Sequence, residues 1–182
     1  CLLTMLKFNV KNNLFFFRIT SRLIPFASHP VMDFDWKGYF KENFNEISDF
    51  IHENNIRISM HPGQFVVINS KDDEVFKRSL HELRYHAHIF DLLKLDSTAK
   101  MQLHVGGVYG DKEKSIERFI ERYGDLEKDI KRRLVIENDE KSYNLSDCLE
   151  ISKETKIPVL FDYFHHELNN NGDELHLCFE KF

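Results

Sequence analysis

Residues 134–139 read LVIEND, a short apolar run that ends in two acidic residues around an asparagine. Similar short runs recur along the chain, and each is typical of a strand in a parallel sheet that is covered on both faces. The expected strands are Phe15–Ile19, Ile56–Met60, Met101–Val105, Leu134–Glu137 and Pro158–Asp162.

Amphipathic helical patterns lie between these runs. Phe40, Phe44, Ile47 and Ile51 share one helical face, and a capping-box-like start at residues 70–73 opens the next helix. A further helix is expected to begin near Asp111. Two more are expected over Leu145–Thr155 and Leu2–Asn12.

The regular alternation of strands and helices implies right-handed βα units and a parallel sheet. A closed (β/α)₈ barrel usually needs about 250 residues, whereas this chain has 182. We therefore expect an α/β fold, an internal portion of a TIM-type barrel with about five parallel strands, as a single domain over residues 1–182. A flavodoxin-like open sheet of five strands is an alternative that the order of elements does not exclude.

The composition limits the function classes. Hydrophobic residues make up 42% and charged residues 30% of the chain, so wholesale disorder is excluded. The net charge of −5 argues against bulk attraction to nucleic acid unless bound cations reverse the sign locally. No apolar run reaches the roughly 18–20 residues of a membrane helix. Three cysteines without a CxxC motif favour a reducing, intracellular compartment.

Polar residues gather where the expected strands end. In a barrel, successive strand ends converge on one mouth, so these side chains should meet there as a metal cluster. Each residue alone has an ordinary explanation, such as a hydrogen-bonded histidine or a helix-capping carboxylate, but five successive strands supply a ligand type at the same end. The expected ligands, which suit Zn²⁺ or Mn²⁺, are His29, His61, His104, Glu137, Asp162 and His165.

Two features near these ligands point to a phosphate-bearing substrate. Directly after His61, the Gln64-Phe65 pair follows a Pro-Gly turn, and a polar-aromatic pair can wedge into stacked bases. Gly106-Gly107 follows His104 and lets the backbone approach a ligand closely. The alternative for the glycines is that they simply turn the chain.

Five motifs in order resemble those of the UV damage endonuclease family, over about residues 14–170. They are RITSRLIPFASH (18–29), RISMHPGQFVVINS (57–70), LHVGGVYGDK (103–112), LVIENDEKSY (134–143) and VLFDYFHHELNN (159–170). The resemblance implies a TIM barrel related to abasic-site endonucleases that use three metal ions. It also implies an enzyme that nicks DNA immediately 5′ to pyrimidine dimers and other lesions.

Carried over by motif, the resemblance makes Glu137 a carboxylate that bridges two cations and, with His104, a catalytic residue. Gln64 and Phe65 become the pair that enters the DNA at the lesion, although a Tyr also occurs in the family at the Phe65 position. The six expected metal ligands match the family's motifs. Further ligands of the family fall outside residues 1–182, so we expect this stretch alone to bind fewer metals and to have little nuclease activity.

The resulting expectation is a metal-dependent DNA repair endonuclease. Its cofactors would be divalent cations, Mn²⁺ first, with Mg²⁺ or Zn²⁺ as alternatives. Its partner would be damaged double-stranded DNA, with no membrane and no obligate protein partner, and in a prokaryote it would be cytoplasmic and nucleoid-associated. The competing interpretations are a metal-dependent sugar isomerase of the same barrel type and a non-catalytic module that binds damaged DNA.

Overall fold

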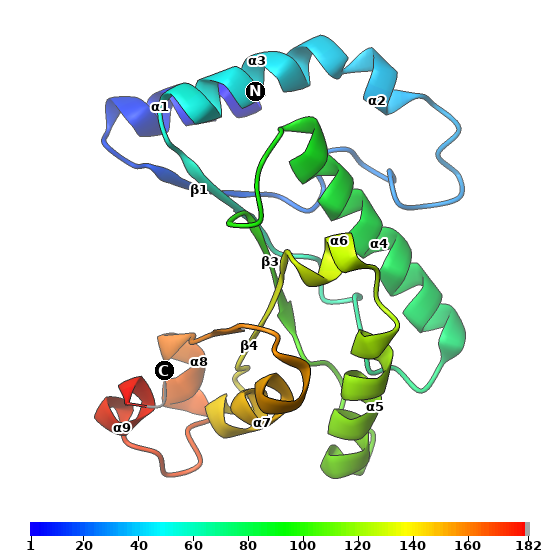
Figure 1. Ribbon diagram of the computed structural model, residues 1–182, viewed down its shortest axis with the longest axis vertical. Coiled ribbons are helices and arrows are strands. Elements are labelled where there is room, and N and C mark those ends of the chain that lie inside the picture. The colour runs from blue at the N-terminus through cyan, green and yellow to red at the C-terminus, as the bar shows by residue number, and fades with distance from the viewer. Residues whose placement is uncertain (181–182) are drawn as a thin grey trace.

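The computed structural model describes residues 1–180, in which five strands form one parallel sheet in the order β1-β2-β3-β4-β5 (Figure 1). The strands are β1 (Phe16–Ile19), β2 (Arg57–Met60), β3 (Lys100–His104), β4 (Leu134–Glu137) and β5 (Val159–Leu160). A flavodoxin-like sheet would not place its strands in sequence order. The consecutive, fully parallel order is that of a barrel, so the flavodoxin-like alternative is wrong.

Helices connect these strands as the sequence predicts. They are α1 (Leu2–Lys11), α2 (Trp36–Tyr39), α3 (Lys41–Glu53), α4 (Asp73–Leu92), α5 (Lys112–Gly124), α6 (Lys128–Lys131), α7 (Leu145–Thr155), α8 (Tyr163–Leu168) and α9 (Leu175–Phe179). The four helices of six residues or fewer were not predicted, because a single turn or two is too short to show an apolar period.

Local capping explains where the longer helices begin. The carboxylate of Asp72 accepts the backbone N–H groups of Glu74 and Val75 at the start of α4. Asn144 and Asp147 form a reciprocal capping box at the start of α7. Because these bonds satisfy N–H groups that lack an intrahelical partner, the cap residues set the first helical residue.

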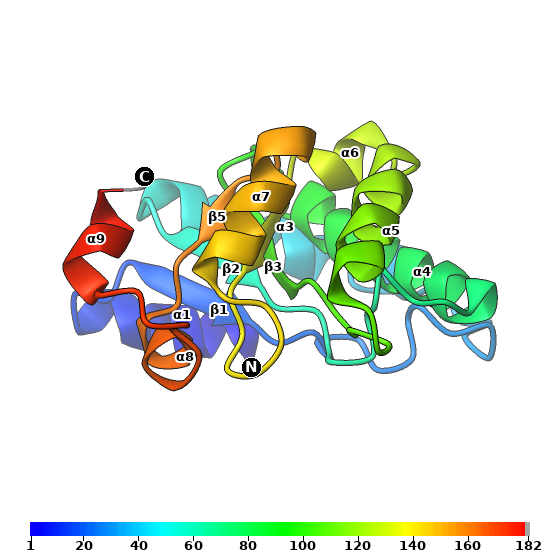
Figure 2. The same ribbon diagram turned by 90° about the horizontal axis from the view of Figure 1, so that it is seen from below.

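The hydrophobic core lies between one face of the sheet and the helices that connect its strands (Figure 2). Met60 pairs with Met101 in the register of β2 and β3, and both are fully buried on this face together with Ile136. The neighbouring residues in each strand point to the opposite face because strand side chains alternate. The apolar face thus leaves the other face for polar side chains at the strand ends.

One edge of the sheet differs from the expectation that every strand is buried on both faces. Phe16 and Arg18 of β1 are exposed, and only Ile19 of that strand is buried. Within residues 1–180, β1 pairs with β2 alone, so it has a neighbouring strand on one side.

None of the helices in residues 1–180 combines the length and the apolar character that crossing a membrane would require.

Replacing Met101 by Ala should lower the free energy of unfolding by about 2–5 kcal/mol, because it leaves a cavity in the centre of the core. The matched control is Met5→Ala, since Met5 is 48% exposed on α1. Urea unfolding monitored by circular dichroism compares the two variants. Equal losses would contradict the placement of the core.

Candidate metal centre

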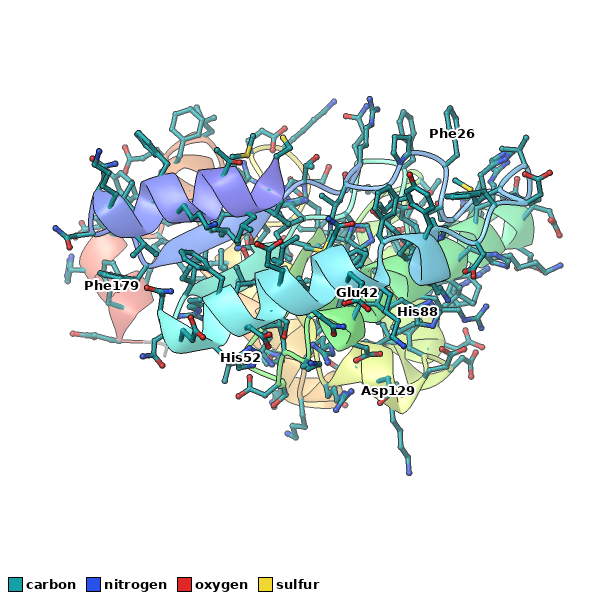
Figure 3. All side chains as sticks on the ribbon, turned by 90° about the horizontal axis from the view of Figure 1, so that it is seen from above. Phe26, Glu42, His52, His88, Asp129 and Phe179 are labelled. Atoms are coloured by element: carbon teal, nitrogen blue, oxygen red, sulfur yellow. The ribbon has the colours of Figure 1, made fainter. Side chains whose placement is uncertain are left out.

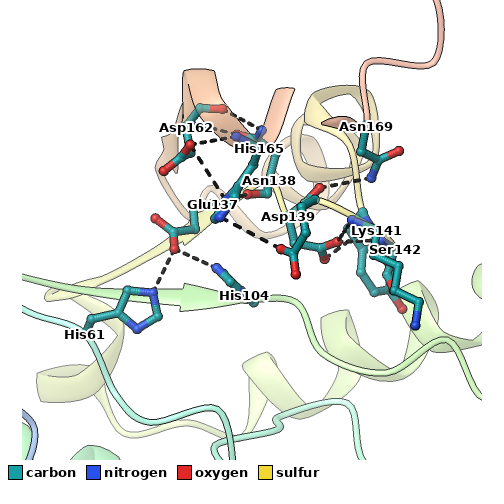
Figure 4. Close-up of polar contacts among 12 residues, drawn as sticks. His61, His104, Glu137, Asn138, Asp139, Lys141, Ser142, Asp162, His165 and Asn169 are labelled. Carbon is teal, nitrogen blue, oxygen red and sulfur yellow. Dashed lines mark hydrogen bonds and ion pairs between the residues drawn. The ribbon is translucent and has the colours of Figure 1, made fainter. Parts of the chain in front are cut away.

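Three polar side chains meet where β2, β3 and β4 end (Figure 4). His104 and Glu137 are the last residues of β3 and β4 and lie opposite each other in the register. His61 directly follows the last residue of β2. The alternation of strand side chains directs all three to the face of the sheet opposite the core.

The geometry of this group centres on one carboxylate oxygen. The Nε2 atoms of His61 and His104 each lie 2.7 Å from Oε1 of Glu137. Potential ligand atoms of the three residues all fall within 4.8 Å of one another. Glu137 is buried, whereas the two histidines are half-buried, so the group is reachable from solvent through the imidazoles.

The hydrogen bond on the far side of the His61 ring orients its metal-binding atom. Nδ1 lies 2.8 Å from the carbonyl oxygen of Pro62. Because a carbonyl only accepts, Nδ1 carries the hydrogen and donates it. Nε2 faces Oε1 of Glu137, and a cation bound there would replace the hydrogen between these two atoms while the bond to Pro62 keeps the ring oriented, which is the usual arrangement of a metal-ligating histidine.

Glu137 and His104 shift each other's pKa. Burial raises the pKa of Glu137, but the hydrogen bonds from His104 and His61 outweigh it and bring that pKa to about 2. The hydrogen bond to Glu137 in turn raises the pKa of His104. At neutral pH Glu137 is therefore a carboxylate. Two imidazole nitrogens and one carboxylate oxygen fit a divalent cation such as Zn²⁺ or Mn²⁺.

His165 lies beside this group without being one of the three. Its ring centroid is 5.3 Å from that of His104, and its Nδ1 donates to the carbonyl oxygen of Asn138 over 2.9 Å. Asp162 accepts the backbone N–H of His165 at 2.8 Å and thereby caps α8. The carboxylate of Asp162 thus caps a helix, which is the alternative to a metal-binding role that the sequence analysis gave for such a residue.

His29 lies on the loop that follows β1 and does not join the group. It is exposed, and its Nδ1 accepts the backbone N–H of Val31 at 3.1 Å. In this conformation Nδ1 is engaged locally. The metal-binding roles of His29, Asp162 and His165 stay predictions.

Asn138, which the sequence did not single out, joins β4 to β5. Its fully buried side chain donates to the carbonyl oxygen of Asp162 at 2.9 Å and accepts the N–H of the same residue at 2.8 Å. This pair of bonds ends β5 earlier than predicted and positions Asp162. The position of Asn138 directly after Glu137 in the sequence does not reveal that its partner is Asp162.

The residue after Asn138 organises the next loop. The carboxylate of Asp139 accepts the backbone N–H groups of Lys141, Ser142 and Tyr143. The loop is thereby held folded beside the metal group.

The glycine pair after His104 turns the chain. Gly107 donates its N–H to Asn69 at 3.1 Å and accepts from the side chains of Asn69 and Tyr143, both fully buried. At Gly106, where φ is +120°, an added Cβ would lie 2.4 Å from Oδ1 of Asn69. Since the Gly107 N–H is already engaged, the structure favours the turn over the phosphate-loop interpretation.

Gln64 and Phe65 occupy the tip of a short β-turn. The N–H of Val66 donates to the carbonyl oxygen of Gly63 at 2.9 Å and closes the turn. Phe65 is 76% exposed. Val67, two residues after Phe65, donates its N–H to Oγ of the buried Ser79 on α4, which anchors the turn.

A cavity of about 580 Å³ connects this turn with the metal group. Its walls come from His61, His104, Tyr109, the Gly106-Gly107 pair and the segments 62–64, 66–67 and 139–142. Gln64 of the turn and the candidate ligands His61 and His104 therefore border one space.

Comparisons with known proteins identify relatives of this chain. The family described as UV-endonuclease UvdE matches residues 1–181. A UV DNA damage endonuclease of Clostridium perfringens is 44% identical over 162 residues, which cover 89% of this chain and 39% of that protein. The chain thus spans about two fifths of the length of this curated relative.

Solved structures confirm the TIM-barrel class. The crystal structure of SacUVDE superposes with a TM-score of 0.95 at 47% identity, over 100% of this chain and 62% of that one. D-Psicose 3-epimerase from Clostridium cellulolyticum H10 has a TM-score of 0.69 at 15% identity, over 98% of this chain and 63% of that one. At so low an identity the epimerase shows a shared fold alone.

The affinity of the group for Mn²⁺ should rise with pH, because His104 must lose a proton before its Nε2 can bind a cation. Glu137 raises the pKa of His104 above 6.5, so protons still compete near neutral pH. Below that raised pKa the dissociation constant should fall about tenfold per pH unit, and above it the value should level off. Calorimetric titrations from about pH 6 to about pH 8.5 measure this dependence, and an affinity that falls with pH would contradict the assignment.

Proposed function

Since the chain belongs to the UV-endonuclease UvdE family, we propose that it acts as a metal-dependent DNA repair endonuclease that nicks the backbone 5′ to UV photoproducts and other lesions. The observation that carries the proposal is the convergence of two Nε2 atoms on Oε1 of Glu137, where both imidazoles border a cavity that Gln64 of the exposed turn also lines. Its substrate is damaged double-stranded DNA.

His61, His104 and Glu137 would hold the divalent cation. When bound, such a cation polarises a phosphoryl oxygen and lowers the pKa of water. The chain supplies a carboxylate that stays ionised at neutral pH and two half-buried imidazoles. Mn²⁺ is the first expectation because the donors mix nitrogen and oxygen, with Zn²⁺ and Mg²⁺ as alternatives.

His29, Asp162 and His165 are proposed as further ligands. Asn138 supports two of them, because it binds the backbone of Asp162 and accepts from Nδ1 of His165. The donated Nδ1 hydrogen leaves Nε2 of His165 free to bind a cation. His29 would first have to release the N–H of Val31 or present its other ring nitrogen.

Lesion recognition is assigned to Gln64 and Phe65. The pair would occupy the gap that forms when a damaged dinucleotide leaves the base stack. Damage lowers the cost of unstacking, and this difference supplies selectivity without base-specific hydrogen bonds. Because the turn is closed by Val66 and anchored through Ser79, little conformational entropy is lost when it enters the DNA.

Replacing Glu137 by Gln should abolish lesion-dependent nicking and weaken Mn²⁺ binding at least about tenfold, since a neutral amide is a poor ligand for a cation. The matched control is Glu121→Gln, because Glu121 is exposed on α5. Relaxation of UV-irradiated supercoiled plasmid by the full-length protein gives the rate, and circular dichroism confirms folding. Unimpaired nicking by the Glu137 variant, or nicking that persists in excess chelator, would refute the proposal.

Replacing both Gln64 and Phe65 by Ala should leave Mn²⁺ binding unchanged and reduce the discrimination between damaged and undamaged duplex. Base–aromatic stacking contributes about 1–3 kcal/mol per base, so the affinity ratio should fall about 5- to 150-fold. Fluorescence anisotropy on matched lesion and control duplexes measures it. If the ratio does not change, the pair is a structural turn.

A further inference from the structure

Backbone conformation marks two aromatic residues on the loops that follow strands. Among the described residues, seven besides glycine have a positive φ. Four of them lie at or just beyond the C-terminal end of a helix, where the left-handed conformation is common; they are Asn13, Asn55, Lys94 and Lys156. A fifth is Asn171, and asparagine tolerates this conformation. The other two are Phe26 and Tyr109, for which a positive φ is unusual.

Phe26 occupies a turn position that favours glycine. The N–H of Ala27 donates to the carbonyl oxygen of Ile24 at 3.3 Å, so Pro25 and Phe26 are the central residues of a β-turn. Proline suits the first central position, and a positive φ at the second defines a type II turn, where Gly or Asn is preferred. Phe26, with φ of 61°, is strained there.

Packing does not offset this strain. Phe26 is 69% exposed, and its ring stands nearly perpendicular to that of the exposed His29, at a centroid distance of 6.5 Å. Figure 3 shows the ring projecting away from the ribbon on the loop after β1. Tyr109 differs, because its ring lies over Gly107 and beside Arg118. Phe26 is thus the residue whose conformation the fold leaves unexplained.

The surroundings of Phe26 match a nucleic acid. Arg22 lies on the same loop and Arg18 on β1, both are exposed, and neither has a carboxylate partner among residues 1–180. Exposed cations on the same strand and loop as an exposed aromatic ring provide phosphate attraction and a stacking surface together. β1 also neighbours β2, whose following loop carries the exposed Phe65.

We propose that Phe26 stacks on a DNA base near the lesion, as a second aromatic contact distinct from the Gln64-Phe65 turn. The proposal rests on the function proposed above. The strained turn holds the ring out into solvent, so that a base flipped or unstacked at the damage site can lie against it. Arg22 then faces the phosphate backbone of the same strand.

The test replaces Phe26 by Gly, which the turn prefers, and by Tyr, which keeps the ring. Phe26→Gly should weaken binding to a duplex with a single thymine dimer at least about fivefold without lowering the Tm, because the strain is relieved. Phe26→Tyr should bind within about twofold of the wild type, since the stacking face is retained. Phe8→Ala, which removes a 63% exposed ring from α1, should change neither quantity.

Fluorescence anisotropy with Mn²⁺ present gives the affinities. If the wild type binds the damaged duplex and Phe26→Gly binds it with the same affinity, this inference is overturned and the proposed function stands. A wild type that does not distinguish damaged from undamaged duplex would overturn both. An unchanged affinity accompanied by a smaller species on gel filtration would assign Phe26 to a protein contact and also overturn the inference.

Discussion

A buried carboxylate held between two imidazoles is the interaction on which the site depends. Burying Glu137 without partners would be costly, because a charge taken out of water must be paired. His61 and His104 supply the two hydrogen bonds to the same oxygen atom, and their effect on the pKa of Glu137 exceeds that of burial. The two histidines therefore stabilise the buried negative charge of Glu137 in the absence of a cation, and a bound cation would stabilise the same charge.

The sheet produces this arrangement by dividing its two faces. Met60 and Met101 pair on the face that packs against the helices, and the following residue of each strand points the other way. His104 and Glu137 stand opposite each other because β3 and β4 pair in register. A shift of one residue would bury the imidazole and expose the apolar side chains, so core packing and site geometry specify the same register.

Local signals carried the sequence prediction furthest. The bounds of β4 and α7 agree with the predicted ranges Leu134–Glu137 and Leu145–Thr155, since the pattern that marks each element lies within a few neighbouring residues. Of the six predicted ligands, the structure brings together His61, His104 and Glu137.

The supports of the site were not predictable because their partners are distant in the chain. Asn69 binds the hydroxyl of Tyr143 across 74 positions, and Asn138 binds Asp162 across 24. An isolated asparagine in a sequence carries no sign of which backbone it will hold. The short β5 has the same origin, since the Asn138 bonds end it.

The most direct test of the central claim is the position of the metal itself. Crystals of the protein grown with Mn²⁺, measured at the manganese absorption edge, give an anomalous difference map. The account predicts a peak within coordination distance, about 2.0–2.3 Å, of Nε2 of His61, Nε2 of His104 and a carboxylate oxygen of Glu137. A fully occupied manganese ion that contacts none of these three residues would contradict it.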